Sequence, residues 1–471
     1  MVSELPPELL AIMSETATSP VAETAAHPVE IELADHYDPD TKDESDLSSV
    51  TIDEHEIMNP PGLVGDIARW ITDTAGKPQP LFSLAASLAV CGTIMGRKIR
   101  DLSNGRTNIF ATIVGESSAG KDYPIKCSKR ILSEAGGENL LMGKMQSSQV
   151  LEARLSESPH TKLVVLGESG HYFGNLGKIK DGSSCKAEIK PLLMELFSSA
   201  NGLYIGSEAI SRTPPRIDQP HVCTLGDTQP STYFGCMTRN DLMDGWAARN
   251  LTFISNDTTK DFRMIDPGDI PAGIIERVRK WIVLQAVMAN GFTANGFKAK
   301  PRIVPTTELA LSTFVQFGKF AQHTGELRKG EGRLSHYLWS KALEQARRIA
   351  LIVAGGESVD APTIDAVEAR YGCNLVTRII QDNERGMERF MSENEWEAEG
   401  KRIFAVIEKA GHKGITTSEL HGKCRWVKGG ANTIRNHLTT LEVHMEPLGG
   451  KGGGMRIWTK SNWFWRSKAN G

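Results

Sequence analysis

Hydrophobic positions follow two different periods along this chain. Residues 63, 67 and 71, and then the apolar stretch 81–95, have the spacing of amphipathic or buried helices. Residues 108–114 form a short apolar run of strand type that ends at Gly115. From there to about residue 253, strand-like runs alternate with helical ones. This alternation predicts an α/β core built on a parallel sheet.

The C-terminal half is mainly helical in pattern. Helices are predicted at residues 274–288, 308–324, 333–354 and 361–388, separated in part by Gly355-Gly356 and Ala361-Pro362. Helical patterns at 397–410, 415–420 and 429–441 then precede two strand patterns at 443–447 and 455–459. Three helices followed by a β-hairpin are typical of the winged helix, a helix-turn-helix variant whose third helix enters the major groove of DNA.

Charge is split unevenly, although 54 Lys and Arg residues nearly balance 57 Asp and Glu residues overall. Residues 1–57 hold fifteen acids and one base, a net charge of −14. The rest of the chain carries a net charge of +11, of which residues 396–471 contribute +7. A basic body predicts nucleic acid as a partner. The acidic segment has too little apolar surface to fold, and is interpreted as a disordered tail that either solubilises the protein or mimics nucleic acid.

Several classes of protein are excluded by composition. The chain has no run of 18 apolar residues and no secretory signal at its start, so no membrane association is expected. Its seven cysteines are scattered and form no Cys-x-x-Cys motif, which favours the reducing cytoplasm.

The stretch from Gly115 to Asp122 matches the G-x-x-x-x-G-K pattern of a phosphate-binding loop between a strand and a helix. In such a loop, backbone N–H groups surround phosphate oxygens and the helix start adds the positive end of its dipole. Lys121 is then expected to reach the β- and γ-phosphates of ATP. The predicted nucleotide-binding residues are Gly115, Glu116, Ser117, Ser118, Ala119, Gly120, Lys121, Asp122 and Thr228.

Two departures from the usual pattern concern the metal ion. Asp122 stands where a Ser or Thr normally binds Mg²⁺, and Gly167 stands where the apolar strand before Glu168 normally ends in Asp. Because a carboxylate is a good Mg²⁺ ligand, we expect Asp122 to compensate for the missing acid. Glu168 is expected to contact the metal and polarise the attacking water. The alternative is a site that binds ATP but hydrolyses it poorly.

Two more positions are candidates for catalysis. The strand at 221–228 ends in Asp227 and Thr228, and one of them is expected to sense the γ-phosphate, unless the pair only caps a turn. Arg249 follows a short helix and precedes an apolar strand, which is where an arginine finger acts on a neighbouring subunit. A surface salt bridge is the alternative for this arginine. The predicted catalytic residues are therefore Lys121, Glu168 and Arg249.

Together these motifs resemble a family of phage and mobile-element proteins with a RecA/AAA+-like core, usually described as primase-helicases or replicative helicases. The resemblance covers roughly residues 58–395 and rests on residues 115–124, 163–170, 202–206, 224–230, 244–251 and 337–354. It implies an ATP- and Mg²⁺-dependent DNA helicase or translocase that acts in replication as a homo-oligomer, by analogy a hexameric ring. A separate primase or other replication proteins would be its partners. An acid after the loop lysine resembles one branch of this family, whereas Gly167 departs from it.

DNA contacts are expected in two places. In the winged helix, Asn432, Arg435 and Asn436 would face the major groove, while phosphate contacts would come from Arg425, Lys428, Lys451 and Arg456. The basic segment after Glu168, with Lys178, Lys180 and Lys190, would line the pore of a ring, unless it is only solvated.

The predicted organisation has five parts: an acidic disordered tail (1–57), a helical N-terminal part of the core (58–107), an α/β P-loop ATPase core (108–265), a helical lid or bundle (266–395) and a winged-helix domain (396–471). Only 57 residues precede the core, so no primase activity is expected. Two alternatives to the helicase remain open. One is a replication initiator or helicase loader that uses ATP as an assembly switch, and the other is a DNA-binding regulator with a degenerate nucleotide site.

Overall fold

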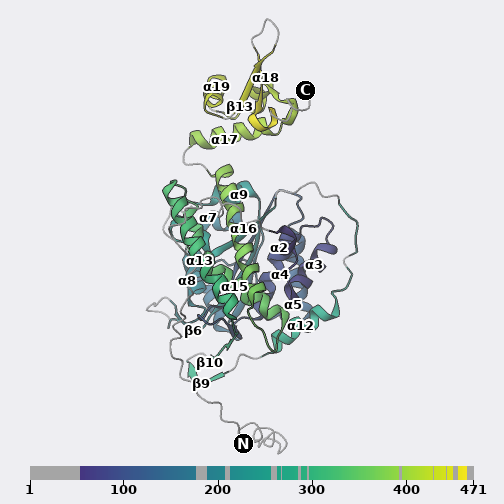
Figure 1. Cartoon of the computed structure of the whole chain (residues 1–471), viewed down its shortest axis with the longest axis vertical. Helices are drawn as coiled ribbons and strands as arrows, with labels where there is room; N and C mark the ends of the chain where they lie inside the picture. The colour runs from purple at the N-terminus through teal and green to yellow at the C-terminus, as the bar shows by residue number, and fades with distance from the viewer. Residues whose placement is uncertain are drawn as a thin grey trace, which may run out of the picture. The chain divides into compact units, whose positions relative to one another are not determined.

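The computed structural model describes residues 53–176, 188–206, 213–255, 262–266, 268–284, 288–293, 296–391, 395–427, 429–441, 443–448 and 454–463. Its centre is a five-stranded, all-parallel sheet (Figure 1) with the strand order β3-β4-β7-β2-β8. These strands are β2 (Phe110–Gly115), β3 (Leu141–Met142), β4 (Thr161–Leu166), β7 (His221–Thr228) and β8 (Asn250–Ser255). The predicted α/β core with a parallel sheet is confirmed.

The sheet is buried on both faces, which explains why its strands are almost continuously apolar. Alternate side chains of β2 enter two separate clusters. Ala111 and Ile113 join a hydrophobic cluster with residues of the helices α3, α4, α15 and α16. Phe110 joins a second cluster on the opposite face, with residues of α6, α7 and α8. The two-residue period of a strand thus divides one apolar run between two helical layers.

The helices of the core lie before, between and after the strands along the chain. Figure 1 shows α13, α15 and α16 side by side. Those up to β8 are α2 (Glu54–Met58), α3 (Gly62–Asp73), α4 (Pro80–Ile94), α5 (Asp122–Glu134), η2 (Glu138–Leu140), α6 (Ser148–Ser156), α7 (Ser169–Leu176), α8 (Ile189–Ser199), α9 (Pro230–Cys236), α10 (Arg239–Met243) and α11 (Trp246–Arg249). Those after it are α12 (Ala272–Val283), α13 (Glu308–Gly330), α14 (His336–Trp339), α15 (Ala342–Glu357) and α16 (Ala366–Phe390).

Three small two-stranded sheets accompany the central one. Strands β1 (Ile99–Arg100) and β11 (Arg302–Ile303) pair in parallel, while β5 (Leu203–Ile205) with β6 (Arg216–Asp218) and β9 (Met288–Thr293) with β10 (Gly296–Ala299) pair antiparallel. No helix in the described part of the chain is both long and apolar enough to cross a membrane.

The C-terminal residues form a unit with its own hydrophobic core. Its elements are α17 (Glu395–Glu408), η3 (Gly411–Lys413), β12 (Ile415–Thr416), α18 (Thr417–Lys423), α19 (Gly430–Thr440), β13 (Val443–Pro447) and β14 (Met455–Thr459). The antiparallel sheet has the order β12-β14-β13. Both hairpin strands lie at the predicted residues, and Thr416 caps α18 through a capping box with Glu419. Trp458 is buried and its indole N–H donates to the carbonyl of His412.

Several boundaries differ from the predictions. The segment expected to be disordered through residue 57 is folded at its end, where Asp53 caps α2 and Ile57 is buried. The helix predicted at 274–288 ends at Val283 and is followed by the β9–β10 hairpin. The helix predicted at 333–354 is two helices, because the backbone leaves the helical region at Lys341.

Gly355 and Gly356 were expected to interrupt a helix, but both lie inside α15. Their role is close packing. A Cβ at Gly355 would lie 2.7 Å from the Met95 sulfur, and one at Gly356 would lie 3.3 Å from a Val64 methyl. Glycine therefore allows α15 to approach the two helices that precede the sheet.

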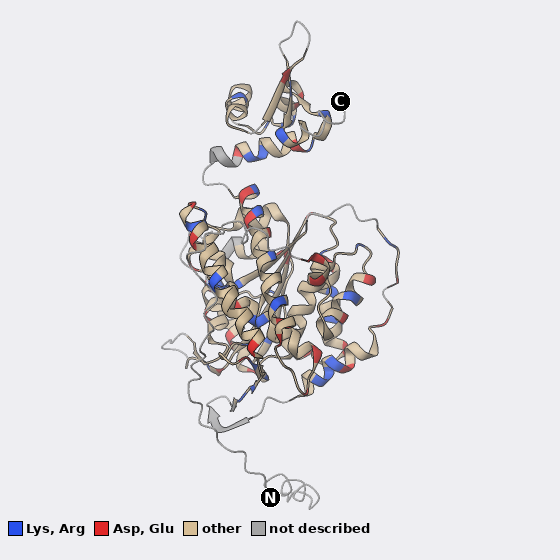
Figure 2. Cartoon of the chain, in the orientation of Figure 1, with Lys and Arg blue, Asp and Glu red and all other residues tan. Residues whose placement is uncertain are grey.

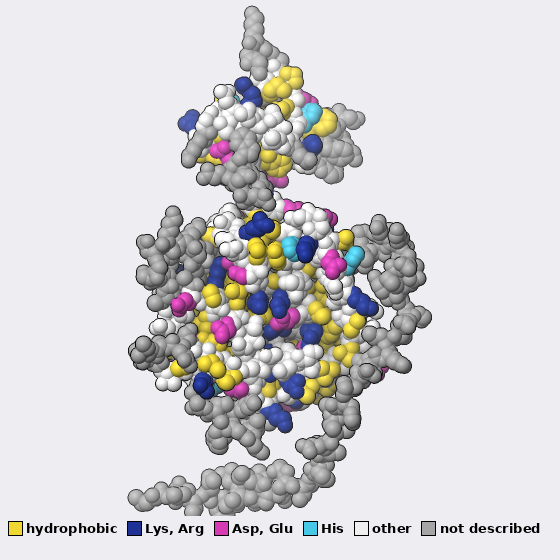
Figure 3. All heavy atoms as spheres, turned by 90° about the vertical axis from the view of Figure 1, so that its left-hand side faces the viewer, with side chains coloured by type: hydrophobic (Ala, Val, Ile, Leu, Met, Phe, Trp, Pro, Cys, Tyr) yellow, Lys and Arg dark blue, Asp and Glu magenta, His cyan; other side chains and the backbone are white. Residues whose placement is uncertain are grey.

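Charged residues of both signs occur along the outer helices, as the blue and red segments of α13 and α16 in Figure 2 show. Hydrophobic side chains also reach the surface, including Leu309 and Leu327 of α13. Figure 3 shows hydrophobic, basic and acidic side chains interspersed over one face of the molecule.

The closeness of α15 and α16 yields a stability prediction. A Cβ at Gly372 in α16 would lie 2.3 Å from the carbonyl oxygen of Ala346 in α15. We expect Gly372→Ala to destabilise the fold by about 1–3 kcal/mol through overpacking. The matched control is Gly273→Ala in α12, where a Cβ meets nothing within 4 Å and stabilisation of about 0.4–1 kcal/mol is expected. Melting temperatures measured by calorimetry test this, and equal values for both variants would contradict it.

Candidate functional site

The order of the strands brings three separate segments to one edge of the sheet. From β2 the chain goes to the outer strand β3, returns through β4 to β7, and then crosses to β8 on the other side of β2. In open parallel sheets, ligands bind beyond the carboxyl ends of the strands where the strand order reverses. Here that edge carries residues 115–121, which we name the glycine loop, together with Gly167 and Glu168 after β4, and Asp227 at the end of β7.

Left-handed backbone conformations shape the glycine loop. Ser118 has φ +66° and Gly120 has φ +83°, and successive N–H groups in such turns form concave anion-binding surfaces. The loop ends where α5 begins at Asp122. At Gly115 and Gly120, neighbouring atoms leave no room for a side chain. A Cβ at Gly115 would lie 2.7 Å from the Phe82 ring, and one at Gly120 would lie 3.0 Å from the carbonyl oxygen of Lys77.

Exposure differs sharply within the glycine loop. Glu116, Ser117 and Ser118 are exposed, whereas Lys121 retains only 7% of its surface. Within the described residues, Lys121 forms neither a hydrogen bond nor an ion pair. The loop therefore holds a cation for which the described residues supply no direct counter-ion.

Asp227, near the end of β7, is a carboxylate whose pKa is influenced by the charges at this loop. It is 5% exposed, and one of its oxygens, Oδ1, accepts a hydrogen bond of 3.3 Å from the backbone N–H of Glu168. Burial raises its pKa, the charge of Asp122 raises it further, and the nearby Lys121 ammonium opposes both. The Glu168 carboxylate also raises this pKa. One ammonium and three carboxylates thus interact at the edge of the sheet.

Glu168 lies on a strained turn. Its φ of +51° is rare for a residue with a side chain, and such strain concentrates at functional sites. The Ser169 hydroxyl donates to the carbonyl of Asp227 at 3.1 Å, which fixes the turn against β7. The Glu168 side chain is exposed. Its position beside the glycine loop agrees with the predicted grouping of Lys121, Asp122 and Glu168.

Thr228, predicted to contact nucleotide, points elsewhere. Successive side chains of a strand lie on opposite faces, and Asp227 takes the face toward the glycine loop. Thr228 is fully buried against α7, where a Cβ at Gly170 would lie 2.4 Å from its hydroxyl oxygen. That hydroxyl has no hydrogen-bond partner among the described residues. Of the two candidates at the end of β7, the structure therefore brings Asp227 to the loop.

Gln229 is a further residue of the site that the sequence prediction missed. Its side-chain amide donates to the Ser117 hydroxyl oxygen at 3.0 Å and so joins the end of β7 to the glycine loop. The available signal was its place directly after the polar end of a strand, at the N-cap of α9.

A cavity of about 580 Å³ opens at the same edge, next to β8. Ser255 lines it, and Ser255 pairs in register with Gly115. Its walls are both apolar and basic, and are formed by Met58, Gln79, Pro80, Leu81, Phe234, Ile254, Ser255, Arg378, Asp382, Arg385, Gly386, Arg389 and Phe390.

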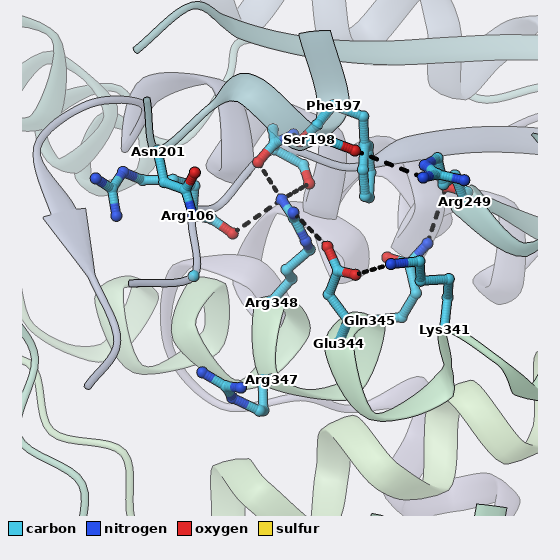
Figure 4. A network of polar contacts seen from close by, with 12 residues as sticks. Arg106, Phe197, Ser198, Asn201, Arg249, Lys341, Glu344, Gln345, Arg347 and Arg348 are labelled. Carbon is cyan, nitrogen blue, oxygen red and sulfur yellow. Dashed lines mark hydrogen bonds and ion pairs between the residues drawn. The ribbon is translucent and has the colours of Figure 1, made fainter. Parts of the chain in front are cut away.

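Arg249 lies at the opposite, amino edge of the sheet from its own glycine loop. It precedes β8, and the first residue of that strand pairs with Phe110, whereas the loop follows the other end of β2. Figure 4 shows its guanidinium beside Phe197 and Ser198. One nitrogen donates to the carbonyl of Gly245 at 3.0 Å, and the guanidinium has no carboxylate partner among the described residues. The described residues therefore do not contain the surface salt bridge that was the alternative interpretation of Arg249.

Arg348 organises the polar network around Arg249 (Figure 4). It is buried on α15, pairs with Glu344 at 2.7 Å and donates to the carbonyl of Asn108 at 2.9 Å, just before β2. On the same helix, Gln345 donates to the carbonyl of Arg249 at 2.9 Å. Burial lowers the pKa of Arg348, and Glu344 opposes that shift.

The candidate DNA residues of the C-terminal unit are only partly described. Asn432, Arg435 and Asn436 are exposed on α19, opposite the buried Ile434 and Leu438. Arg425 is exposed as well, whereas Arg456 is half-buried on the central strand β14. Four more candidates, Lys178, Lys180, Lys428 and Lys451, lie outside the described residues.

Lys190 was grouped with the basic segment after Glu168, but the structure assigns it another role. It lies in α8 and forms an ion pair of 2.7 Å with the buried Asp241. It also lies 5.7 Å from the centre of the Trp246 ring. Its charge is neutralised within the protein and is not presented to a DNA strand.

The described side chains do not form a complete metal cage. No group of three or more His, Cys, Asp or Glu residues in the described ranges is arranged to hold a metal ion. Mg²⁺ usually retains several waters and is bound by one or two carboxylates together with substrate phosphates. Asp122 and Glu168, the predicted metal residues, fit that pattern because both are exposed beside the glycine loop.

Comparison with known proteins adds no assignment. No protein-family model matches the chain, and no curated protein matches it.

The raised pKa of Asp227 predicts a pH-dependent gain in stability for Asp227→Asn. An acid whose folded-state pKa exceeds its unfolded value destabilises the fold above that pKa, and the penalty disappears below the ordinary Asp value of 3.8. The variant should therefore melt at a higher temperature than the wild type at pH 7.5, and the difference should shrink as the pH approaches 4. Asn keeps the acceptor for the Glu168 N–H. Asp269→Asn, at a fully exposed carboxylate, should change little, and a lower melting temperature for Asp227→Asn would refute the argument.

Proposed function

We propose that this protein is a P-loop ATPase that couples nucleotide binding and hydrolysis to movement on DNA, as a replicative helicase or translocase of a phage or mobile element. The observation that carries the proposal is the buried, unpartnered Lys121 in a glycine loop between a central strand and a helix. A triphosphate is the anion that this arrangement suits, because backbone N–H groups, a helix N-terminus and a lysine converge there.

In the proposed site, each residue has a separate role. The glycine loop binds the phosphates, and Lys121 neutralises the charge that develops on the γ-phosphate. Glu168 orients the attacking water from its exposed turn, and Asp122 helps to hold the cation. Mg²⁺, when bound, would supply positive charge that offsets the negative charge of the phosphates. Gln229 positions the loop through Ser117.

The cavity beside β8 is the proposed place for the nucleoside. It borders Ser255, the strand neighbour of Gly115, so a triphosphate on the loop could extend into it. Its walls include Phe234 and Phe390, whose rings are stacked, and Met58. Apolar and aromatic walls of this kind suit a base.

Arg249 supports an oligomeric enzyme. Because it lies at the amino edge of the sheet, it cannot reach the glycine loop of its own subunit. A guanidinium without a carboxylate partner among the described residues could instead stabilise charge in the site of a neighbouring subunit. A ring, by analogy with six subunits, would bring the two edges together.

The C-terminal unit is proposed to be a winged helix that binds DNA. It has three helices and a β-hairpin, and α19 exposes Asn432, Arg435 and Asn436 on one face while it buries Ile434 on the other. Residues 396–471 carry a net charge of +7, which favours contacts with phosphates.

Gly167 favours a second candidate function. The strand β4 carries no carboxylate at the position where ATPases of this type place a metal-ordering acid, which is expected to slow hydrolysis. An initiator or helicase loader, which uses ATP as an assembly switch, tolerates slow turnover. DNA-stimulated hydrolysis with strand displacement favours the helicase, and ATP-dependent assembly on duplex DNA without unwinding favours the switch.

Two substitutions should separate binding from turnover. Lys121→Ala should weaken ATP affinity at least about tenfold, because it removes a charge-assisted contact of about 1.5–3 kcal/mol. Glu168→Gln should leave affinity nearly unchanged and lower turnover by about 100-fold, the typical effect of a general base. Affinity is measured by isothermal titration calorimetry, and turnover by phosphate release with and without single-stranded DNA.

Lys77→Ala provides the matched control for Lys121→Ala, because the Lys77 atoms nearest to Gly120 are in its backbone and its Cβ, which Ala retains. It should bind ATP as the wild type does. Equal ATP affinity of the wild type and Lys121→Ala would rule out the proposed site.

The DNA-binding surface can be tested with single basic residues of the C-terminal unit. Arg425→Ala, at an exposed residue predicted to contact phosphate, should weaken binding to duplex DNA and reduce the slope of affinity against salt concentration by about one. Lys409→Ala, which removes the same charge from an exposed position directly after α17 and outside the proposed surface, should have a smaller effect. Fluorescence anisotropy at several salt concentrations measures both. Identical salt slopes for the two variants would argue against the proposed DNA-binding surface.

A further inference from the structure

We propose that Asp227 of β7 supplies the carboxylate that β4 lacks at Gly167, and that it orders the hydrated divalent cation of the bound nucleotide. The inference rests on the proposed function, since it assigns the cation-positioning residue of that same site. It differs from the expectation drawn from the sequence, in which Asp122 partly replaces the missing acid.

The first argument is position. Strands β4 and β7 pair in register up to Leu166 and Gly226, so residues 167 and 227 are the next neighbours across the sheet. A Cβ built at Gly167 would have Asp227 Oδ1 as its nearest atom, at 4.0 Å. The Asp227 carboxylate therefore lies next to the position where a side chain at residue 167 would begin. Strand β7 thus provides a carboxylate beside the position at which β4 lacks one.

The second argument is orientation. Asp227 Oδ1 accepts from the N–H of Glu168, which fixes the carboxylate against the turn that carries the proposed water-orienting residue. The side chain lies on the same face of β7 as Cys223 and Leu225, and these two residues join the hydrophobic cluster that contains Ala119 of the glycine loop. Asp122 itself is exposed in the first turn of α5, so it is held less firmly.

The third argument is charge. The charges of Asp122, Glu168 and Lys121 all act on Asp227, so three carboxylates face one ammonium electrostatically, and a nucleoside triphosphate would add more negative charge. Such an excess requires a cation between the groups. The described side chains provide no complete cage. A hydrated ion that is bound partly by the phosphates and ordered on its other side by Asp227 accounts for both the excess of negative charge and the incomplete cage.

Lys121 is independent evidence that a ligand belongs here. It is more than nine-tenths buried and lacks a hydrogen-bond or ion-pair partner in the described part of the chain. Carboxylates alone could form an ordinary salt bridge with it. Their failure to do so leaves the ammonium available to an anion, and the carboxylates available to the cation that accompanies it.

The experiment measures how much Mg²⁺ strengthens the binding of a non-hydrolysable ATP analogue. In the wild type, Mg²⁺ should increase affinity, and Asp227→Asn should lose about tenfold or more of that increase. Affinity without Mg²⁺ should fall little, because Lys121 and the loop are intact. Glu326→Gln, which removes one exposed carboxylate from α13, is the charge control and should behave as the wild type does. Mn²⁺ binding in the presence of the analogue, followed by electron paramagnetic resonance, gives a second measurement that does not depend on turnover.

A relocated carboxylate provides the decisive variant. Gly167 has an ordinary backbone conformation and no atom closer than 4.0 Å to a built Cβ, so it can accept a side chain. The double substitution Gly167→Asp with Asp227→Asn should restore the effect of Mg²⁺. Thermal melting of each variant establishes that it is folded.

The outcomes distinguish this inference from the proposed function. If the wild type binds no nucleotide, the proposed function fails and this inference fails with it. If the wild type and Asp227→Asn show the same gain in affinity from Mg²⁺ and the same Mn²⁺ spectrum, only the role of Asp227 is overturned. Loss in Asp227→Asn and recovery in the double variant support it.

Discussion

The architecture depends on one constraint, which is that a parallel sheet buried on both faces must send all of its strands out at the same edge. Helices cover both faces of the sheet, so the polar groups that remain there need a partner, as Thr112 finds in Asn250. The charged residues at the ends of β2, β4 and β7 are collected at the carboxyl edge, although they are separated by more than forty positions in sequence. The candidate site is a consequence of this constraint, and the helices serve mainly to keep the edge accessible.

Much of the fold follows from local sequence signals. The strand before Gly115, the capped start of α18 and the two C-terminal strands lie where their patterns predicted, because turn residues and caps act over a few positions. The break at Lys341 had no such signal, since neither glycine nor proline marks it. At Gly355-Gly356 a signal was present but had another cause, because helix packing needs small residues as much as turns do.

The candidate site also combines features that local sequence predicted with features that it did not. The glycine loop could be recognised from residues 115–121 alone, because its chemistry depends on the order of neighbouring residues. The juxtaposition of Asp227 with Gly167 could not be predicted, since it depends on which strand lies next to β4 and on which face of β7 each side chain occupies. A missing acid in one motif and an extra acid in another are separate oddities in the sequence. In three dimensions they are a single feature.

Hydrogen bonds from α15 hold the amino edge of the sheet and link its two edges. Arg348 holds the backbone just before β2, and Gln345 holds the backbone just before β8, less than one helical turn away. These two strands are paired along their whole length and end beside the glycine loop and the cavity. An extended strand pair of six residues behaves as a stiff rod about 20 Å long. The pair is therefore tied to one turn of α15 at its amino end and borders the candidate site at its carboxyl end, so the two edges of the sheet share a single structural element.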